Sequence, residues 1–195
     1  RYSTDSRWFL PHFEKMIYDQ AMQAIAYTEA YQATGKEKYE ETAREIFAYV
    51  LRDMTSSEGG IYSAEDADSE GVEGKFYLWS SDEIREVLEG EDAELIIRIF
   101  NVIESGNYSE ESTGEKTGTN ILFLTKSLDA LAADLKVPEE ELDKRMDAAR
   151  RKLFAHREKR VHSLKDDKIL TDWNGLMIVA LAKGARAFDE SEYAQ

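Results

Sequence analysis

Apolar side chains recur every three or four residues in two neighbouring stretches, and this periodicity predicts helices in both. The first stretch runs from Pro11 to Gly35, and the second covers residues 37–54. Pro11 suits the first turn of a helix, and Gly35 suits the position just after its last turn. Because the link between them is short, the two stretches predict an antiparallel helical hairpin.

Further helices follow along the chain, separated by polar loops. Ser80 or Ser81 caps the next one, and Pro138 opens a longer one that ends in basic residues. The others are predicted over residues 91–100, 128–135 and 176–188, and the last is apolar nearly all round, so we expect it to be buried. Residues 101–119 are predicted as a long loop. Helical hairpins joined in this way are typical of solenoids and of α/α toroids, and spacing alone leaves both open.

An acidic segment interrupts the helical pattern. Its carboxylates repel one another unless water, a cation or a polar ligand lies between them. Residues 61–63 and 75–79 are predicted as the two strands of a small β-hairpin that closes this segment as a loop. The carboxylates are Glu65, Asp66, Asp68, Glu70 and Glu73.

Three readings of the acidic segment stay open. Asp66, Asp68 and Glu70 match the opening of a calcium-binding EF-hand loop, but Tyr77 takes the place of the glutamate that closes such a loop. Glu65, Asp66 or Asp68 could supply a catalytic carboxylate, since glycosidases need two carboxyl groups roughly 5 to 9.5 Å apart. The segment could also be a solvated or hydrogen-bonded structural loop. We predict no metal site and no cofactor.

Charge and cysteine content narrow the classes of function. The net charge is −15, which repels nucleic acid and anionic membrane surfaces, so neither is expected as a partner. The chain has no cysteine, which excludes disulfides and Cys-based zinc sites and suits a cytoplasmic setting. Its 195 residues are enough for one domain. We expect residues 1–195 to be a single domain cut from a longer protein.

Three segments together resemble one protein family. They read RWFLPHFEKMIYD at residues 7–19, YSAEDADSEG at 62–71 and DDKILTDWNGLM at 166–177. They closely resemble the spermatogenesis-associated, thioredoxin-fused proteins. The resemblance implies a mainly α fold, part of a six-hairpin (α/α)6 toroid similar to that of N-acylglucosamine 2-epimerases and several glycosidases. It also implies a thioredoxin-like domain elsewhere in the protein.

The first of these segments supplies a candidate site. On the predicted helix, His12, Lys15 and Asp19 share one stripe, and Glu14 lies beside it. In the functional reading His12 is a general acid or base, and Glu14, Lys15 and Asp19 tune it or bind a polyol. In the structural reading Lys15 pairs with Asp19 on the helix surface.

Trp173 and Asn174 are the candidates from the third segment. An indole face stacks on the apolar side of a sugar ring, and an amide hydrogen-bonds hydroxyl groups. The alternative is a buried Trp at a helix start, with Asn174 or Asp172 as the cap.

Two functions remain in view. The first is a carbohydrate-active domain, a sugar epimerase, isomerase or glycosidase, that uses His12 with carboxylates of the acidic segment on a sugar or other polar small molecule. The second is a non-catalytic binding or scaffold module that accompanies a thioredoxin-like domain. We also expect apolar helix faces to be exposed, so that this chain associates with itself.

Overall fold

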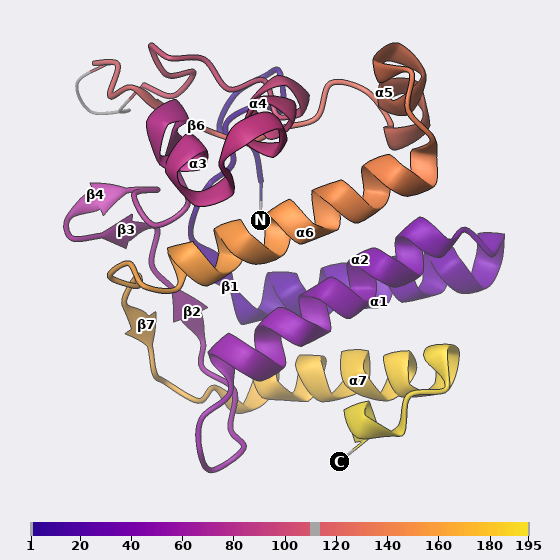
Figure 1. Ribbon diagram of the computed structural model, residues 1–195. Coiled ribbons are helices and arrows are strands. Elements are labelled where there is room, and N and C mark those ends of the chain that lie inside the picture. Colours follow the sequence, from indigo (N-terminus) through magenta and orange to yellow (C-terminus); the bar gives the residue numbers. More distant parts are fainter. Residues whose placement is uncertain (1, 110–113, 195) are drawn as a thin grey trace. The chain divides into compact units, whose positions relative to one another are not determined.

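The computed structural model describes residues 2–109 and 114–194, and within them the chain is mainly helical with short strands (Figure 1). The chain forms two compact units. The first contains Tyr2, His12–Ala67 and the segment that starts at Ser163; the second contains Ser3–Pro11 and Asp68–His162. The prediction that residues 1–195 are one domain of a longer toroid stays a prediction.

The first unit is built on three helices. α1 (Ile17–Thr34) packs against both α2 (Glu37–Tyr49) and α7 (Thr171–Phe188), as Figure 1 shows. The predicted hairpin of the first two helices is confirmed. Gly35 ends α1 with a φ of +67° and donates its N–H to the carbonyl of Tyr31 at 2.7 Å, a conformation that glycine adopts without strain. A π-helical turn, η1 (Val50–Met54), continues α2, and a 3-10 turn, η2 (Ser191–Ala194), follows α7.

The start of α1 differs from the prediction. Pro11 does not open it; the chain stays extended through β1 (Lys15–Met16), and the helix begins at Ile17. The backbone of Lys15 and Met16 pairs instead with β2 (Ala64–Glu65). Inter-strand hydrogen bonds of this kind come from a segment far along the chain, so local helix signals at Pro11 could not reveal them.

A small three-stranded sheet joins the ends of these helices. β2 is the central strand, with β1 on one side and β7 (Lys165–Asp166) on the other, both antiparallel. Lys15 lies opposite Glu65, and Glu65 lies opposite Lys165.

The second unit holds the remaining helices and two further strand pairs. β5 (Trp79–Ser80) pairs with β6 (Thr119–Asn120), and the side chain of Ser80 accepts the N–H of Glu83 at 3.1 Å, which confirms the predicted cap. Its apolar core includes Ile84, Ile96 and Leu142. The helices, all close to their predicted positions, are α3 (Ser81–Leu88), α4 (Gly90–Ile99), α5 (Leu128–Leu135) and α6 (Glu139–Arg157).

The acidic segment is not the loop between strands that the sequence suggested. β3 (Asp68–Ser69) and β4 (Val72–Glu73) form a hairpin inside it. Glu70 and Gly71 connect them with φ values of +53° and +75°, as a two-residue hairpin turn requires. Within the predicted strand at 75–79, residues 75–77 form a turn and only Trp79 belongs to a strand. Residues 61–63 make one isolated bridge, from Ile61 to Thr55.

Helix α7 and the segment at 101–119 both differ from their predictions. Ile178 and Val179 are 62% and 47% exposed, so α7 is buried on one face only. That face carries Met177, Ala180 and Gly184 at helical spacing. The predicted loop at 101–119 contains an isolated bridge between Ser109 and Lys116, and its last residue, Thr119, begins β6. Residues 110–113 lie outside the described residues.

Across residues 2–109 and 114–194, no helix combines the length and the hydropathy that crossing a bilayer requires.

Candidate functional site

The three segments that carry the family resemblance meet in the small sheet of the first unit. β1 comes from the first segment and β2 from the second, and β7 ends at Asp166, the first residue of the third segment. The N–H of Ile17 donates to the carbonyl of Ser63 at 2.9 Å, and the N–H of Ser63 donates to the carbonyl of Asp166 at 3.1 Å. Segments far apart in the sequence thus become neighbours through backbone hydrogen bonds. We call this region the motif sheet.

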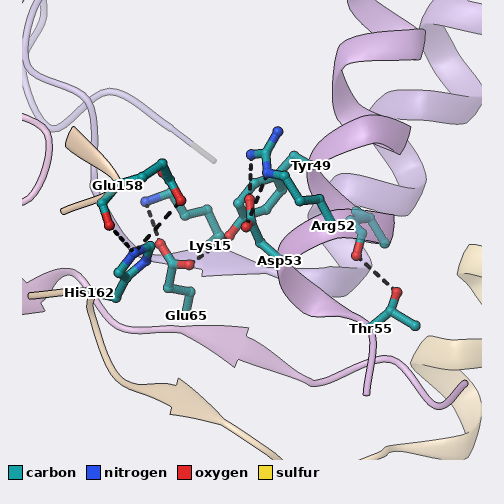
Figure 2. A network of polar contacts seen from close by, with 9 residues as sticks. Lys15, Tyr49, Arg52, Asp53, Thr55, Glu65, Glu158 and His162 are labelled. Carbon is teal, nitrogen blue, oxygen red and sulfur yellow. Dashed lines mark hydrogen bonds and ion pairs between the residues drawn. The ribbon is translucent and has the colours of Figure 1, made fainter. Parts of the chain in front are cut away.

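Glu65 is the buried acid of the motif sheet, and Figure 2 shows it between Lys15 and Tyr49. It is 4% exposed. Its Oε1 lies 3.2 Å from the Lys15 ammonium, and its Oε2 accepts the Tyr49 hydroxyl at 3.1 Å. Both carboxylate oxygens therefore have a partner from another element, which is what a buried charge needs to be tolerated.

His12 lies half-buried just before β1. Its Nδ1 accepts the backbone N–H of Glu14 at 3.2 Å, and its ring packs on Tyr2 with the centroids 4.8 Å apart. An accepting Nδ1 places the proton of the neutral ring on Nε2. His12 is thereby arranged as a hydrogen-bond donor through Nε2.

The predicted stripe of His12, Lys15 and Asp19 does not exist, because only Asp19 is helical. The expected Lys15–Asp19 ion pair is replaced by the pair of Lys15 with Glu65. Glu14 and Asp19 are half-buried, and Asp66 is exposed beside Glu65.

Asp68 belongs to the second unit and not to the motif sheet. It is exposed on β3, opposite Glu73.

Trp173 and Asn174 lie in the first turn of α7. The ring of Trp173 packs edge-on against Tyr18, with the centroids 4.9 Å apart. Asn174 binds both backbone polar groups of Ile61: its Oδ1 accepts the N–H and its Nδ2 donates to the carbonyl, each at 2.9 Å. Nδ2 also donates to the carbonyl of Leu170 at 3.0 Å, so both amide hydrogens are used inside the protein.

The expected helix cap is not made. Leu170 occupies the N-cap position of α7 without a side-chain hydrogen bond, and Asp172 accepts only the adjacent N–H of Trp173. On β7, a hydrogen bond from Lys168 lowers the pKa of the Asp166 carboxyl, so this carboxylate stays charged at neutral pH.

The calcium reading finds no matching geometry in the described residues. Glu70 pairs with Lys75 at 2.8 Å on the hairpin turn. In the part of the chain that the structure describes, no group of three or more His, Cys, Asp or Glu side chains could hold a metal ion.

Tyr49 is the site residue that sequence reasoning missed. It was predicted, correctly, to be helical, but nothing in its own helix indicates a contact with Glu65. Only the paired strands bring that carboxylate to the end of α2. A tyrosine near the end of a predicted helix carries no local signal for such a role.

Known proteins were compared with this chain by family, by sequence and by structure. No protein-family model matches the chain. It has homologues named spermatogenesis-associated protein 20: the human protein is 37% identical over 199 residues, which cover 93% of this chain and 25% of the human protein. An uncharacterised protein of Caenorhabditis elegans is 31% identical over 99% of this chain and 29% of its own length. The chain thus spans about a quarter of the length of the curated relatives it matches.

One solved structure is also similar. It is a crystal structure of D-mannose isomerase, at a TM-score of 0.34 and 13% identity, covering 98% of this chain and 40% of that one. A score this low does not establish a common fold.

Proposed function

We propose that this chain is the sugar-binding part of an α/α-toroid isomerase or epimerase, and that its ligand binds at the motif sheet. The observation that carries the proposal is the meeting of the three motif segments in one sheet. Eight of the nine candidate residues belong, with the motif sheet, to the first unit, and Asp68 is the exception. The eight are His12, Glu14, Lys15, Asp19, Glu65, Asp66, Trp173 and Asn174. A cytoplasmic location, suggested by the lack of cysteine, is part of the same proposal.

The chemistry assigned to the site is proton transfer next to a carbonyl group. A base removes the proton from the carbon beside the carbonyl, and a donor protonates the carbonyl oxygen to give an enediol. The isomer forms when the neighbouring carbon takes up a proton and the other enediol hydroxyl loses its own. The epimer forms when the same carbon takes up a proton on its opposite face and the first hydroxyl returns its proton to the donor. His12 is assigned the donor role, because its Nδ1 accepts the N–H of Glu14 and leaves the proton on Nε2.

Asp66 is assigned the role of base. Its neighbour Glu65 uses both oxygens on Lys15 and Tyr49, so it is assigned to positioning. Trp173, whose ring packs against Tyr18, is assigned to stack its indole face on the apolar side of a sugar ring. Asn174 is assigned no contact with substrate, because its amide binds Ile61 and Leu170.

Deuterium exchange tests this assignment. The chain is incubated in D2O with aldoses, ketoses and N-acetylated amino sugars, and mass spectrometry follows deuterium at the carbon beside the carbonyl. We expect exchange with one sugar class, lowered at least about a hundredfold in His12→Ala. His162→Ala, which removes an exposed histidine of the second unit, is the control and should exchange normally. Binding without exchange would contradict the isomerase assignment.

A second candidate is a non-catalytic binding module that accompanies a thioredoxin-like domain. Two candidate residues favour it, because Glu65 and Asn174 are engaged in internal contacts that hold elements together. A sugar that binds the motif sheet without proton exchange, or a protein partner bound there, would support this second function.

A further inference from the structure

The second unit contains a cavity of about 510 Å³ that is rich in arginine. Arg150, Arg151 and Arg157 line one side of it, and all three come from α6. Trp79 and Phe100 contribute aromatic rings, as does Phe154 of α6. We call it the arginine cavity. Its volume is within the usual range of about 300 to 1,000 Å³ for small-molecule sites.

The charge of the arginine cavity is opposite to that of the chain. Three guanidinium groups line it against one carboxylate, that of Asp147, whereas the whole chain carries −15. Nη1 of Arg150 lies 4.0 Å from Oδ1 of Asp147. Arg151 is exposed. Arginine therefore predominates among the charged side chains that line the cavity.

Basic residues near the end of a helix are often explained by the helix dipole alone, which favours cations there by about 0.3–1 kcal/mol. The helix dipole favours a cation near the C-terminal end on any face of the helix, so it does not explain why the arginines lie on one face. Here Asp147, Arg150, Arg151 and Phe154 are spaced as one stripe of α6 and line one cavity. Lys152 has the same charge at nearly the same height on α6 but is not among the lining residues.

The aromatic rings add a second kind of contact. The guanidinium of Arg157 lies 5.4 Å from the ring centre of Phe154 and 5.2 Å from that of Phe76. Its position is thereby set by cation–π contacts on the protein side. Trp79 is buried, and Phe100 and Phe154 are half-buried, so part of the aromatic surface remains open to a flat ligand.

We propose that the arginine cavity binds a small aromatic compound that carries a phosphate group. A phosphate at pH 7 has a charge of about −1.5 to −2, opposite in sign to the three arginines that line the cavity, and its oxygens suit the forked geometry of guanidinium groups. The ring of the ligand packs on Phe100 and Phe154. This proposal does not rest on the sugar site of the first unit, and either can fail without the other.

Calorimetric titration of the chain with phenyl phosphate, inorganic phosphate and benzyl alcohol tests the proposal. We expect phenyl phosphate to bind at least about tenfold more tightly than either of the other probes, and more weakly as salt is raised. Arg150→Gln and Arg151→Gln should each weaken it about tenfold or more. Lys152→Gln removes an equal charge from the same helix outside the cavity and should leave binding within about twofold.

Phe100→Leu keeps an apolar side chain but removes the ring, and it should reduce the preference for phenyl phosphate over inorganic phosphate. Circular dichroism of each variant confirms that it is folded. Equal binding of inorganic phosphate, an equal loss in Lys152→Gln, or no binding of phenyl phosphate would each overturn the proposal.

Discussion

Glu65 is the only acidic side chain that the described part of the chain buries. Its partner Lys15 comes from the neighbouring strand, and its side chain is 19% exposed. Removing one member of a buried ion pair is costly because the other charge stays out of water, although replacing both members by apolar groups is often tolerated. This pair therefore allows a clear test of how the motif sheet is held together.

We predict that Glu65→Gln lowers the free energy of unfolding by about 3 kcal/mol, because Lys15 loses the charge that faces it. The double change Lys15→Met with Glu65→Leu should recover much of this loss. Glu70→Gln breaks an exposed ion pair, with both side chains about half exposed, and should cost under about 0.5 kcal/mol. Urea unfolding measures all three, and a Glu65→Gln loss no larger than that of Glu70→Gln would refute the role of the pair.

Glu40 provides a pH-dependent contact in the first unit. Its carboxylate accepts a hydrogen bond from Arg44 at 2.8 Å, and this bond lowers the pKa of Glu40 from its ordinary 4.5. A lowered folded-state pKa means that the contact stabilises the protein fully above the unfolded pKa and is lost as the pH falls through the folded value. Glu40 also raises the pKa of Tyr31 above 10.0 through a hydrogen bond, so that contribution is lost only at alkaline pH.

We predict that Glu40→Gln lowers the melting temperature most between pH 6 and 9, and that its difference from the unchanged chain shrinks as the pH falls below about 4.5. Melting temperatures measured from pH 3 to 9 for both proteins test this. Parallel curves below pH 4.5 would show that Glu40 does not titrate as described.

At the scale of the element, α7 contains two glycines in opposite surroundings. A Cβ added at Gly184 would lie 2.5 Å from Cε2 of Phe47, whose side chain is fully buried. A Cβ added at Gly175 would meet no atom within 4 Å. Neither residue has a positive φ, so packing alone separates them.

We predict that Gly184→Ala destabilises the chain by about 1–3 kcal/mol, because the methyl group overpacks the contact with Phe47. Gly175→Ala should stabilise it by about 0.5–1 kcal/mol, because alanine favours the helix. Thermal unfolding of the two variants, with the same change in one helix, compares them directly. A stabilising Gly184→Ala would mean that Phe47 moves aside without cost.

The helices could be predicted from the sequence better than the strands. Periodicity and caps located the helices well, because α2, α5 and α6 depend mainly on local signals such as Pro138 and Gly35. β1 was missed because Lys15 and Met16 take their conformation from strand β2, far along the chain. The hairpin of the acidic segment was placed wrongly, although the turn residues Glu70 and Gly71 between alternating side chains were a signal for it.

The sequence predicted which segments form the candidate site, but not the contacts that their residues make. The resemblance selected segments that do meet, but it could not show that Asn174 would bind Ile61 or that Glu65 would bind Tyr49. Such contacts depend on how strands pair and helices dock, which residue type and spacing alone do not determine.

At the scale of the whole molecule, α7 exposes part of its apolar surface. Ile178 and Val179 are 62% and 47% exposed on neighbouring positions. Exposed apolar side chains on one helix favour association with a second copy of the chain.

We predict that the chain self-associates as its concentration rises and that Ile178→Lys weakens this association, which light scattering measures. Leu164→Lys, at an exposed position outside α7, is the matched control.

We have proposed that the three motif segments form one site for a sugar. The most direct measurement is a titration of the isotope-labelled chain with aldoses, ketoses and N-acetylated amino sugars, followed by amide chemical shifts. We expect one sugar class to shift the amides of residues 12–19, 62–66 and 166–174 together, with the β3–β4 hairpin unchanged. Shifts confined to residues outside these segments, or no shift with any sugar, would contradict it.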